Sequence, residues 1–297
     1  MTIGAPDWTL WAGTVGFDKP VPDRLAAASA AGCGWTSVGP LDLLEVDDPR
    51  VRARRIGALA REAGLRLAYD PMMNWYPSEG GIATPFATFS AEQGLELAAE
   101  MGATRMSAMG QLRAEFGDPT TGRDVAAVVD ADLLAEHFAS LCDTAAGLGI
   151  AVELEFIPMT DVRDLATAWH CVRTADRPNG SLIIDCWHFF HCAATLDSLR
   201  AIPGDRIGCV QFNDVGPDDA SSTLFQQVRR RRLPGDGVGD LTSLVRTLAE
   251  IGGLGSIGPE VVNPELAAMP AEQAARLACE RTAAALTDAG VAVAGQP

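Results

Sequence analysis

The stretch LIIDCWHFFHC, residues 182–192, places an Asp, two Cys and two of the chain's four His directly behind a short apolar run. The apolar segment SLIIDCWHFF (181–190) is followed by TLDSLRAI (195–202), a short amphipathic segment. A short apolar run bounded by polar residues is typical of a buried strand, so this unit predicts a strand followed by a helix. The polar residues then lie where the strand ends.

The same unit occurs eight times along the chain. Strands and helices are predicted in pairs at 8–17 and 22–32, 35–41 and 48–64, 65–71 and 90–102, 104–110 and 130–149, 150–158 and 161–174, 181–190 and 195–202, 206–215 and 240–252, and 256–263 and 270–290. Several predicted helices end in Gly immediately before the next apolar run, as a left-handed C-cap requires. Eight alternating units with right-handed crossovers predict the α/β class and a (β/α)8 TIM barrel forming one domain over 1–297. An open doubly wound sheet is the alternative, but no GxGxxG follows the first strand.

Composition excludes several function classes. The net charge of −16 is spread along the chain and repels phosphate backbones, so we expect no nucleic-acid partner. No apolar run approaches the roughly 20 residues that span a bilayer, and the N-terminus lacks the pattern of a secretory signal, so a cytoplasmic protein without membrane contact is expected. The seven cysteines include no CxxC and are expected to be buried, reduced thiols.

Four consecutive predicted strands each bring an oxygen-donor side chain to one end of the barrel. These are Glu155, Asp185, Gln211 and Glu260. Three carboxylates in one cavity repel each other and resist desolvation, and a divalent ion removes that cost. Hard oxygen donors suit Mn²⁺, Mg²⁺ or Co²⁺ better than a structural Zn²⁺, so one divalent ion is predicted, with Zn²⁺ as a further option. Glu153 points to the same side as Glu155, but Glu155 is nearer the carboxyl end of the strand.

Two long predicted loops, 71–89 and 216–239, follow strands at this same end, where active sites of such barrels lie. The second loop contains VRRRRLPGDG, in which Arg231 or Arg232 could grip a substrate carboxylate or phosphate. A solvated basic loop or an oligomer contact is the alternative. Tyr69, with Asp70 beside it, is a further candidate for lining the pocket.

With these residues in view, the chain resembles the sugar phosphate isomerase/epimerase superfamily of xylose isomerase-like TIM barrels over nearly its whole length. The matching segments are LEFIP with Glu155, IDCWH with Asp185 and His188, VQFNDV with Gln211, RRLPGDG (231–237) and GPEVVNPEL with Glu260. Many members have His on the seventh strand, whereas Gln211 and the RRLPGDG segment resemble the members with 3-dehydroshikimate dehydratase or inosose dehydratase activity.

The resemblance implies one divalent metal held by Glu155, Asp185, Gln211 and Glu260, and a small polyhydroxylated keto substrate, namely a keto-sugar, an inosose or a dehydroshikimate-like compound. The metal would polarise a carbonyl and stabilise an enediolate. Proton removal by Glu155 and return by Glu260 would give epimerisation, and loss of a β-hydroxyl protonated by His188 would give dehydration. His188 is also implied as a substrate contact, with a structural imidazole as the alternative.

Three other functions compete with this one. An apurinic endonuclease needs many His ligands and a basic DNA-facing surface, which four His and a charge of −16 disfavour. A non-catalytic sugar-binding barrel stays open, because function resides in the site and not in the fold. A partner-dependent keto-glycoside lyase subunit would use the same enolate chemistry. A homodimer is also expected, although no segment locates its interface.

Overall fold

A computed structural model describes residues 1–294 of the chain except 45, 114–128, 218 and 220. Eight parallel strands close a barrel in sequence order, which confirms the predicted fold class. The strands are β2 (Asp7–Leu10), β3 (Trp35–Val38), β4 (Arg66–Met72), β5 (Arg105–Met109), β6 (Ala151–Glu155), β7 (Gly180–Asp185), β8 (Ile207–Phe212) and β9 (Ser256–Pro259). The register of β2 with β9 completes the closure, since Trp8 pairs with Ile257.

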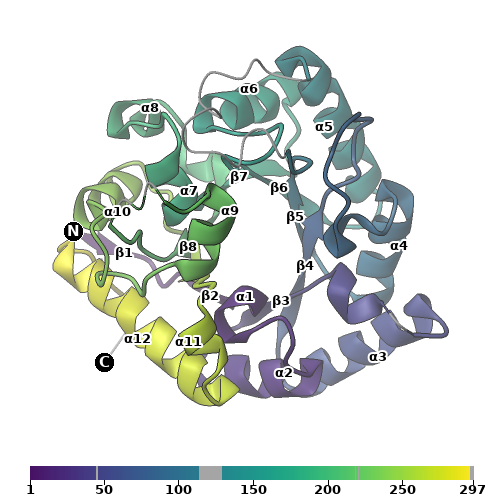
Figure 1. The fold of residues 1–297 in the computed structure, drawn as a ribbon, viewed down its shortest axis with the longest axis horizontal. Helices are drawn as coiled ribbons and strands as arrows, with labels where there is room; N and C mark the ends of the chain where they lie inside the picture. The colour runs from purple at the N-terminus through teal and green to yellow at the C-terminus, as the bar shows by residue number, and fades with distance from the viewer. Residues whose placement is uncertain (45, 114–128, 218, 220, 295–297) are drawn as a thin grey trace.

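A ring of helices covers the outside of the barrel (Figure 1). Its members are α2 (Val21–Ala30), α3 (Pro49–Glu62), α4 (Ala91–Met101), α5 (Ala131–Ala146), α6 (Leu165–Ala175), α8 (Leu196–Arg200), α10 (Leu241–Glu250) and α12 (Ala271–Asp288). The predicted Gly caps are present: Gly102 ends α4 in the left-handed region at φ 74°. None of the described helices is both long and apolar enough to cross a membrane.

Most predicted strands end earlier in the structure than the sequence indicated, and in two of them a helical turn directly follows the strand. β2 ends at Leu10, and α1 (Ala12–Val15) follows. In the stretch 182–192, β7 ends at Asp185 and α7 (Cys186–His191) begins. The reason is local, since Asp185 Oδ1 accepts the His188 backbone N–H at 2.9 Å and so caps α7.

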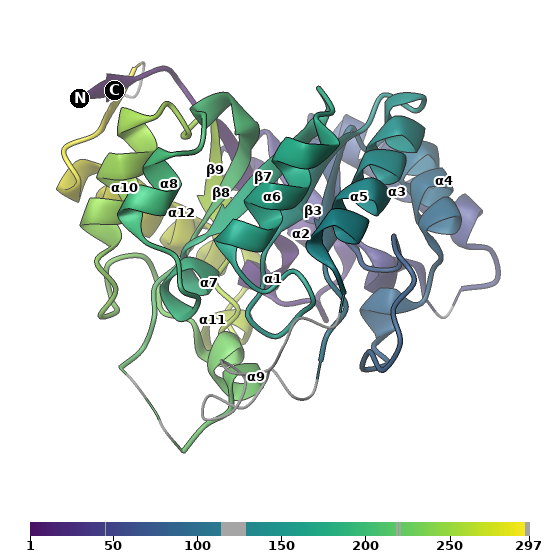
Figure 2. The same ribbon diagram turned by 90° about the horizontal axis from the view of Figure 1, so that it is seen from above.

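Figure 2 separates the two ends of the barrel. The termini lie together at one end, where β1 (Thr2–Ile3) pairs with β10 (Ala292–Val293), a small sheet that the sequence did not predict. The other end carries α7, α11 (Pro264–Ala267) and α9 (Leu224–Gln227), of which α9 forms part of the predicted loop 216–239. This second end holds the carboxyl termini of the barrel strands.

The predicted loop 71–89 is attached to the barrel through Tyr76, which hydrogen bonds to the buried ion pair of Arg113 and Asp161. Asp161 accepts from Arg113 Nε at 2.8 Å and Nη2 at 3.0 Å, and from the Tyr76 hydroxyl at 2.7 Å. The Tyr76 hydroxyl in turn accepts the backbone N–H of Gln111 at 2.7 Å. Because these groups come from three different loops, their network stabilises the loops around the barrel mouth.

All seven cysteines are free thiols, as predicted. Six are buried, and Cys192 is half-buried.

Candidate active site

The four predicted oxygen donors lie at the carboxyl end of neighbouring strands. Glu155 ends β6, Asp185 ends β7, Gln211 lies in β8 beside Asp185, and Glu260 directly follows β9. All four are buried, and the most exposed, Glu260, retains 8% of its surface. Single ligand atoms of Glu155, Asp185 and His188 come within 4.8 Å of one another. The strands therefore bring the predicted donors together, and His188 joins them.

The amide of Gln211 lies against two of the carboxyl groups. With its nitrogen toward them, it donates to Glu155 Oε1 at 3.1 Å and to Asp185 Oδ2 at 3.3 Å. Three buried carboxyl groups, with this amide and the His188 imidazole beside them, are a donor set whose chemistry fits a divalent ion.

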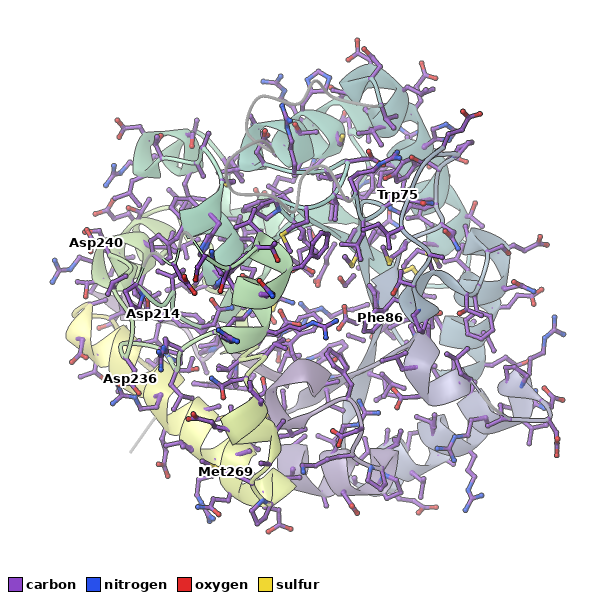
Figure 3. The ribbon with its side chains drawn as sticks, in the orientation of Figure 1. Trp75, Phe86, Asp214, Asp236, Asp240 and Met269 are labelled. Carbon is purple, nitrogen blue, oxygen red and sulfur yellow. The ribbon has the colours of Figure 1, made fainter. Side chains whose placement is uncertain are left out.

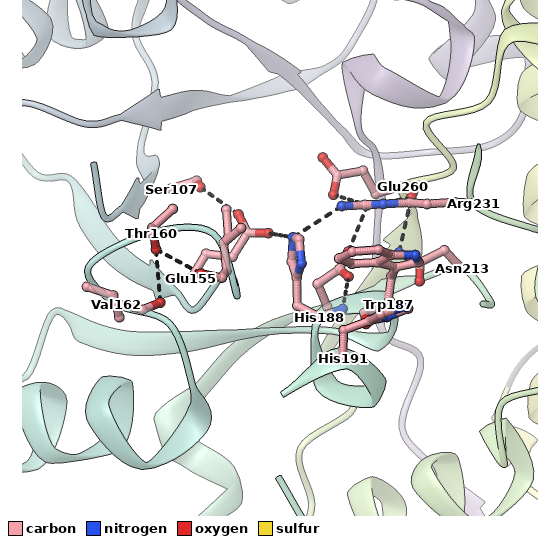
Figure 4. A network of polar contacts seen from close by, with 12 residues as sticks. Ser107, Glu155, Thr160, Val162, Trp187, His188, His191, Asn213, Arg231 and Glu260 are labelled. Carbon is pink, nitrogen blue, oxygen red and sulfur yellow. Dashed lines mark hydrogen bonds and ion pairs between the residues drawn. The ribbon is translucent and has the colours of Figure 1, made fainter. Parts of the chain in front are cut away.

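Arg231 lies inside the carboxylate cluster (Figure 4). Its Nη1 donates to Asp185 Oδ2 at 2.9 Å, to Glu260 Oε2 at 2.7 Å and to the Glu260 backbone carbonyl at 2.9 Å. Its Nη2 lies 3.2 Å from His188 Nε2. With 3% of its surface exposed, this guanidinium is the internal counter-ion of the site.

His188 is held between Glu155 and Arg231, as Figure 4 shows. Its Nε2 lies 3.4 Å from Glu155 Oε1. Burial lowers the pKa of His188 to about 3, so the ring is neutral and its Nε2 accepts from Arg231. In this state the ring is a hydrogen-bond acceptor, and its role as an acid stays a prediction.

Burial also raises the pKa of the carboxyl groups. The pKa of Glu155 rises to about 8, through burial first and then the charge of Asp185. The pKa of Glu260 rises to about 7 through burial, although Arg231 opposes the rise. Burial likewise raises the pKa of Asp185. Carboxyl groups that titrate near neutral pH suit proton transfer, and all of them would ionise more readily around a cation.

Two residues that the sequence did not assign to the site support it. Asn213 Nδ2 donates to Asp185 Oδ2 at 2.7 Å and to the Glu260 carbonyl at 3.1 Å. Ser107 Oγ donates to Glu155 Oε2 at 3.4 Å. The spacing could have indicated Asn213, because it follows Gln211 by two residues and so continues the same face of the strand.

Asp214 shapes the loop that carries Arg231. Its carboxylate accepts four backbone N–H groups, from Val215 at 2.8 Å and from Gly235, Gly237 and Gly239 at 3.1–3.2 Å. A side chain at Gly237 would come within 2.4 Å of Asp214 Oδ1. The glycines of the LPGDGVG run thus let the backbone close around this carboxylate, which lies on the same side of the barrel as Asp236 and Asp240 (Figure 3).

Two other predicted substrate contacts lie away from this cluster. Tyr69 packs on the outer face of β4 toward α4, where a Cβ at Gly94 would come within 3.4 Å of the Tyr69 hydroxyl. Arg232 is exposed, and its backbone pairs with Asp214. Neither is brought together with Glu155 and Asp185.

Glu153, the competing carboxylate of β6, belongs to a different cluster. Its Oε1 accepts from Arg105 Nε at 2.8 Å, and Arg105 Nη1 donates to Ser256 Oγ at 2.9 Å. Since Ser256 begins β9, this pair lies toward the amino end of the barrel. Glu155 alone of the two reaches the carboxyl end.

Comparison with known proteins places these observations in context. Residues 25–285 match the family model described as xylose isomerase-like TIM barrel. The chain is 27% identical to a 3-dehydroshikimate dehydratase of Pseudomonas aeruginosa over 262 residues, covering 86% of this chain and 38% of that protein. It is 29% identical to an inosose isomerase of Bacillus licheniformis over 149 residues, covering 50% of this chain and 52% of that protein. The matches thus span about two fifths to one half of these relatives' own lengths.

Solved structures share the fold. The IolI protein, solved with a zinc atom bound, superposes with a TM-score of 0.78 at 18% identity, covering 95% of this chain and 98% of that one. A D-psicose 3-epimerase, solved in the presence of D-fructose, superposes with a TM-score of 0.66 at 15% identity, covering 96% and 99%.

Proposed function

Because the chain belongs to the xylose isomerase-like TIM barrel family, we propose that it is a divalent-metal-dependent isomerase, epimerase or dehydratase of a small polyhydroxylated keto compound. The observation that carries the proposal is the meeting of ligand atoms of Glu155, Asp185 and His188 within 4.8 Å of one another at the carboxyl end of the barrel. Relatives that are dehydratases and inosose isomerases, and a neighbour solved with zinc, support it.

Glu155, Asp185, Gln211 and Glu260 would hold the ion. A divalent ion held there supplies Lewis-acid polarisation of a carbonyl group, which acidifies the C–H bond beside it. Mn²⁺, Mg²⁺ and Co²⁺ suit this all-oxygen set, and Zn²⁺ also binds such oxygens.

Proton transfer falls to the two glutamates. Glu155 ends β6 and Glu260 follows β9, and β7 and β8 separate these two strands, so the two carboxyl groups reach a substrate from two sides of the barrel. One accepts the proton beside the carbonyl and the other returns a proton, or a β-hydroxyl leaves instead. Arg231 Nη2 and Glu155 Oε1 both lie beside His188 Nε2, at 3.2 Å and 3.4 Å.

The first test is the divalent metal content of the purified protein, measured by inductively coupled plasma mass spectrometry. We expect about one ion per chain in the wild type and a loss of at least tenfold in Asp185→Asn and Glu260→Gln, since each removes a charged ligand. Asp205→Asn, a change at an exposed residue with no described contact to the site, serves as the control and retains the ion. A wild type that stays empty after incubation with Mn²⁺ would overturn the proposal.

The second test is proton exchange. The metal-loaded protein is incubated in D₂O with an inosose or with 3-dehydroshikimate, and deuterium entry beside the carbonyl is followed by NMR. Deuterium exchange accompanied by formation of a new epimer or isomer indicates isomerase chemistry. Exchange accompanied by loss of water from the substrate indicates a dehydratase. No exchange on any keto compound by the loaded protein contradicts catalysis and favours a binding barrel.

A further inference from the structure

Cys33 and Cys279 bring two thiols together outside the candidate active site. Their sulfur atoms lie 3.7 Å apart, although 246 positions of sequence separate the two residues. No other two thiols among the described cysteines hydrogen bond to each other. Because Cys33 lies just before β3, which begins at Trp35, the pair is toward the amino end of the barrel, opposite the predicted metal ligands.

The pair lies where the first and last helices of the outer ring meet. Cys279 is part of α12, and Cys33 lies in the turn between α2 and β3. α12 packs beside α2 (Figure 1). These two helices come from opposite ends of the chain, so noncovalent contacts alone close the ring between them. A bond between Cys33 and Cys279 would close it covalently.

The backbone holds both cysteines in place. The Cys33 N–H donates to the Ala28 carbonyl at 3.0 Å, and Gly32 before it adopts φ 76°, so the turn after α2 has a defined shape. Cys279 lies in the middle of α12, away from both helix ends. Reacting groups that are held next to each other combine far faster than free ones, so the two thiols are positioned to react together.

The hydrogen bond between the thiols makes them chemically different. Donation from the Cys279 thiol lowers the pKa of Cys33, and the same hydrogen bond raises the pKa of Cys279. Since the thiolate is the nucleophile, Cys33 is the thiol that attacks an oxidant, and Cys279 is the thiol that resolves the product. Cys33 and Cys279 expose 6% and 9% of their surface, which favours a small oxidant over a bulky one.

We propose that Cys33 and Cys279 form a redox modification site, at which hydrogen peroxide converts the two thiols into a disulfide that links α12 to the turn after α2. The Cys33 thiolate attacks one peroxide oxygen, the O–O bond breaks, and hydroxide leaves Cys33 as a sulfenic acid. The Cys279 sulfur then attacks the Cys33 sulfur, the S–O bond breaks, and the second oxygen leaves as water. In total, two thiols lose two electrons and two protons, and one peroxide becomes two water molecules.

The disulfide should stabilise the fold without changing the candidate active site. It would close most of the chain into one loop, and a cross-link over a long loop restricts the unfolded state. The site of the predicted ion lies at the other end of the barrel. The inference therefore goes beyond the proposed function and does not depend on it.

The test is peroxide treatment of the folded, fully reduced full chain, followed by alkylation of free thiols in urea and tryptic peptide mapping without reduction. We expect about half of the chains or more to contain peptide 25–50 joined to peptide 277–281 within one chain, with the other five cysteines alkylated. Dithiothreitol should release the link. The oxidised protein should unfold at a temperature about 5 °C or more above that of the reduced protein.

Two variants and a matched control complete the test. Cys33→Ser and Cys279→Ala should lose the link and the rise in unfolding temperature on oxidation. Cys171→Ser changes a buried thiol that contacts the Ala131 carbonyl instead of a second thiol, and it should retain both. A wild type that forms no such link, forms it only between two chains, or forms it without a rise in unfolding temperature overturns the proposal. Metal content, measured on the reduced and oxidised wild type, judges the proposed function separately.

Discussion

Arg231 donates to Asp185 across 46 positions of sequence, with its Nη1 2.9 Å from Asp185 Oδ2. Both side chains are buried, with 4% and 0% of their side-chain surface exposed. The same nitrogen reaches Glu260, so one guanidinium balances two predicted metal ligands. A loop residue is thus part of the charge balance of the barrel interior, and several consequences can be measured.

Removing this guanidinium should destabilise the protein. In Arg231→Met, Asp185 and Glu260 lose their counter-ion while staying buried, and breaking a buried ion pair costs about 3–5 kcal/mol. We expect a loss of this order in the free energy of unfolding of the metal-free protein, measured by urea titration in a chelator. Arg230→Gln, a change at an exposed residue of the same loop, should have little effect. Equal stability of the Arg231 variant and wild type would show that the ion pair contributes nothing.

Stability without metal should fall as the pH rises. Burial raises the pKa of Glu155 to about 8 and that of Glu260 to about 7, so the folded state holds these protons more tightly than the unfolded one. Their stabilising contribution is complete below the ordinary carboxyl value of 4.5 and is lost as the pH rises through 7 to 8. The lowered pKa of His188 has the opposite sign, but that contribution is complete above 6.5.

Between pH 6.5 and 8 the glutamates therefore titrate without an opposing contribution from His188. Over this interval the free energy of unfolding in a chelator should fall by about 1 kcal/mol per pH unit or more. Glu155→Gln removes one of these protons and should flatten the curve, and saturating Mn²⁺ should oppose the fall in the wild type. Stability that rises over this interval in the metal-free wild type would contradict the assignment.

Substitutions of the two glutamates of β6 should differ in their effects on metal content and on stability. Glu155→Gln should lower the metal content at least tenfold with a modest change in stability. Glu153→Gln should retain the ion, but it leaves Arg105 buried without its partner and should cost about 3 kcal/mol. Metal analysis together with urea unfolding of both variants checks this, and loss of metal in Glu153→Gln would show that the two ends of the barrel are coupled.

The Asp214 carboxylate should hold the arginine-rich loop closed. Asp214→Ala removes the acceptor of four backbone N–H groups, so we expect faster tryptic cleavage within residues 229–232 and a loss of about 2 kcal/mol or more. Asp236→Asn, at an exposed position of the same loop that is paired with Arg281, is the matched control. Unchanged cleavage in Asp214→Ala would mean that other contacts hold the loop.

The sequence by itself predicted the barrel and the positions of Glu155, Asp185, Gln211 and Glu260 at one end of it. This was possible because strand and helix periodicity is local, and because closing a parallel barrel brings all strand ends to one place. The preference for Glu155 over Glu153 as a metal ligand followed from the same geometry. Glu153 instead forms an ion pair with Arg105 on the neighbouring strand.

Only the tertiary structure decided which way the loop and flanking residues face. Tyr69 and Asp70 are adjacent, yet Tyr69 is buried toward α4 and Asp70 is half-buried, and the short segment LAYDP does not reveal the register of the pleat. Arg231 is buried and Arg232 exposed where Arg232 pairs in an antiparallel bridge with Asp214, so successive side chains point to opposite sides. The Asp214 carboxylate also binds three amides that lie 21–25 residues further along. Such contacts depend on long-range closure of the chain, so the charge balance of the site is a property of the folded protein and not of any one motif.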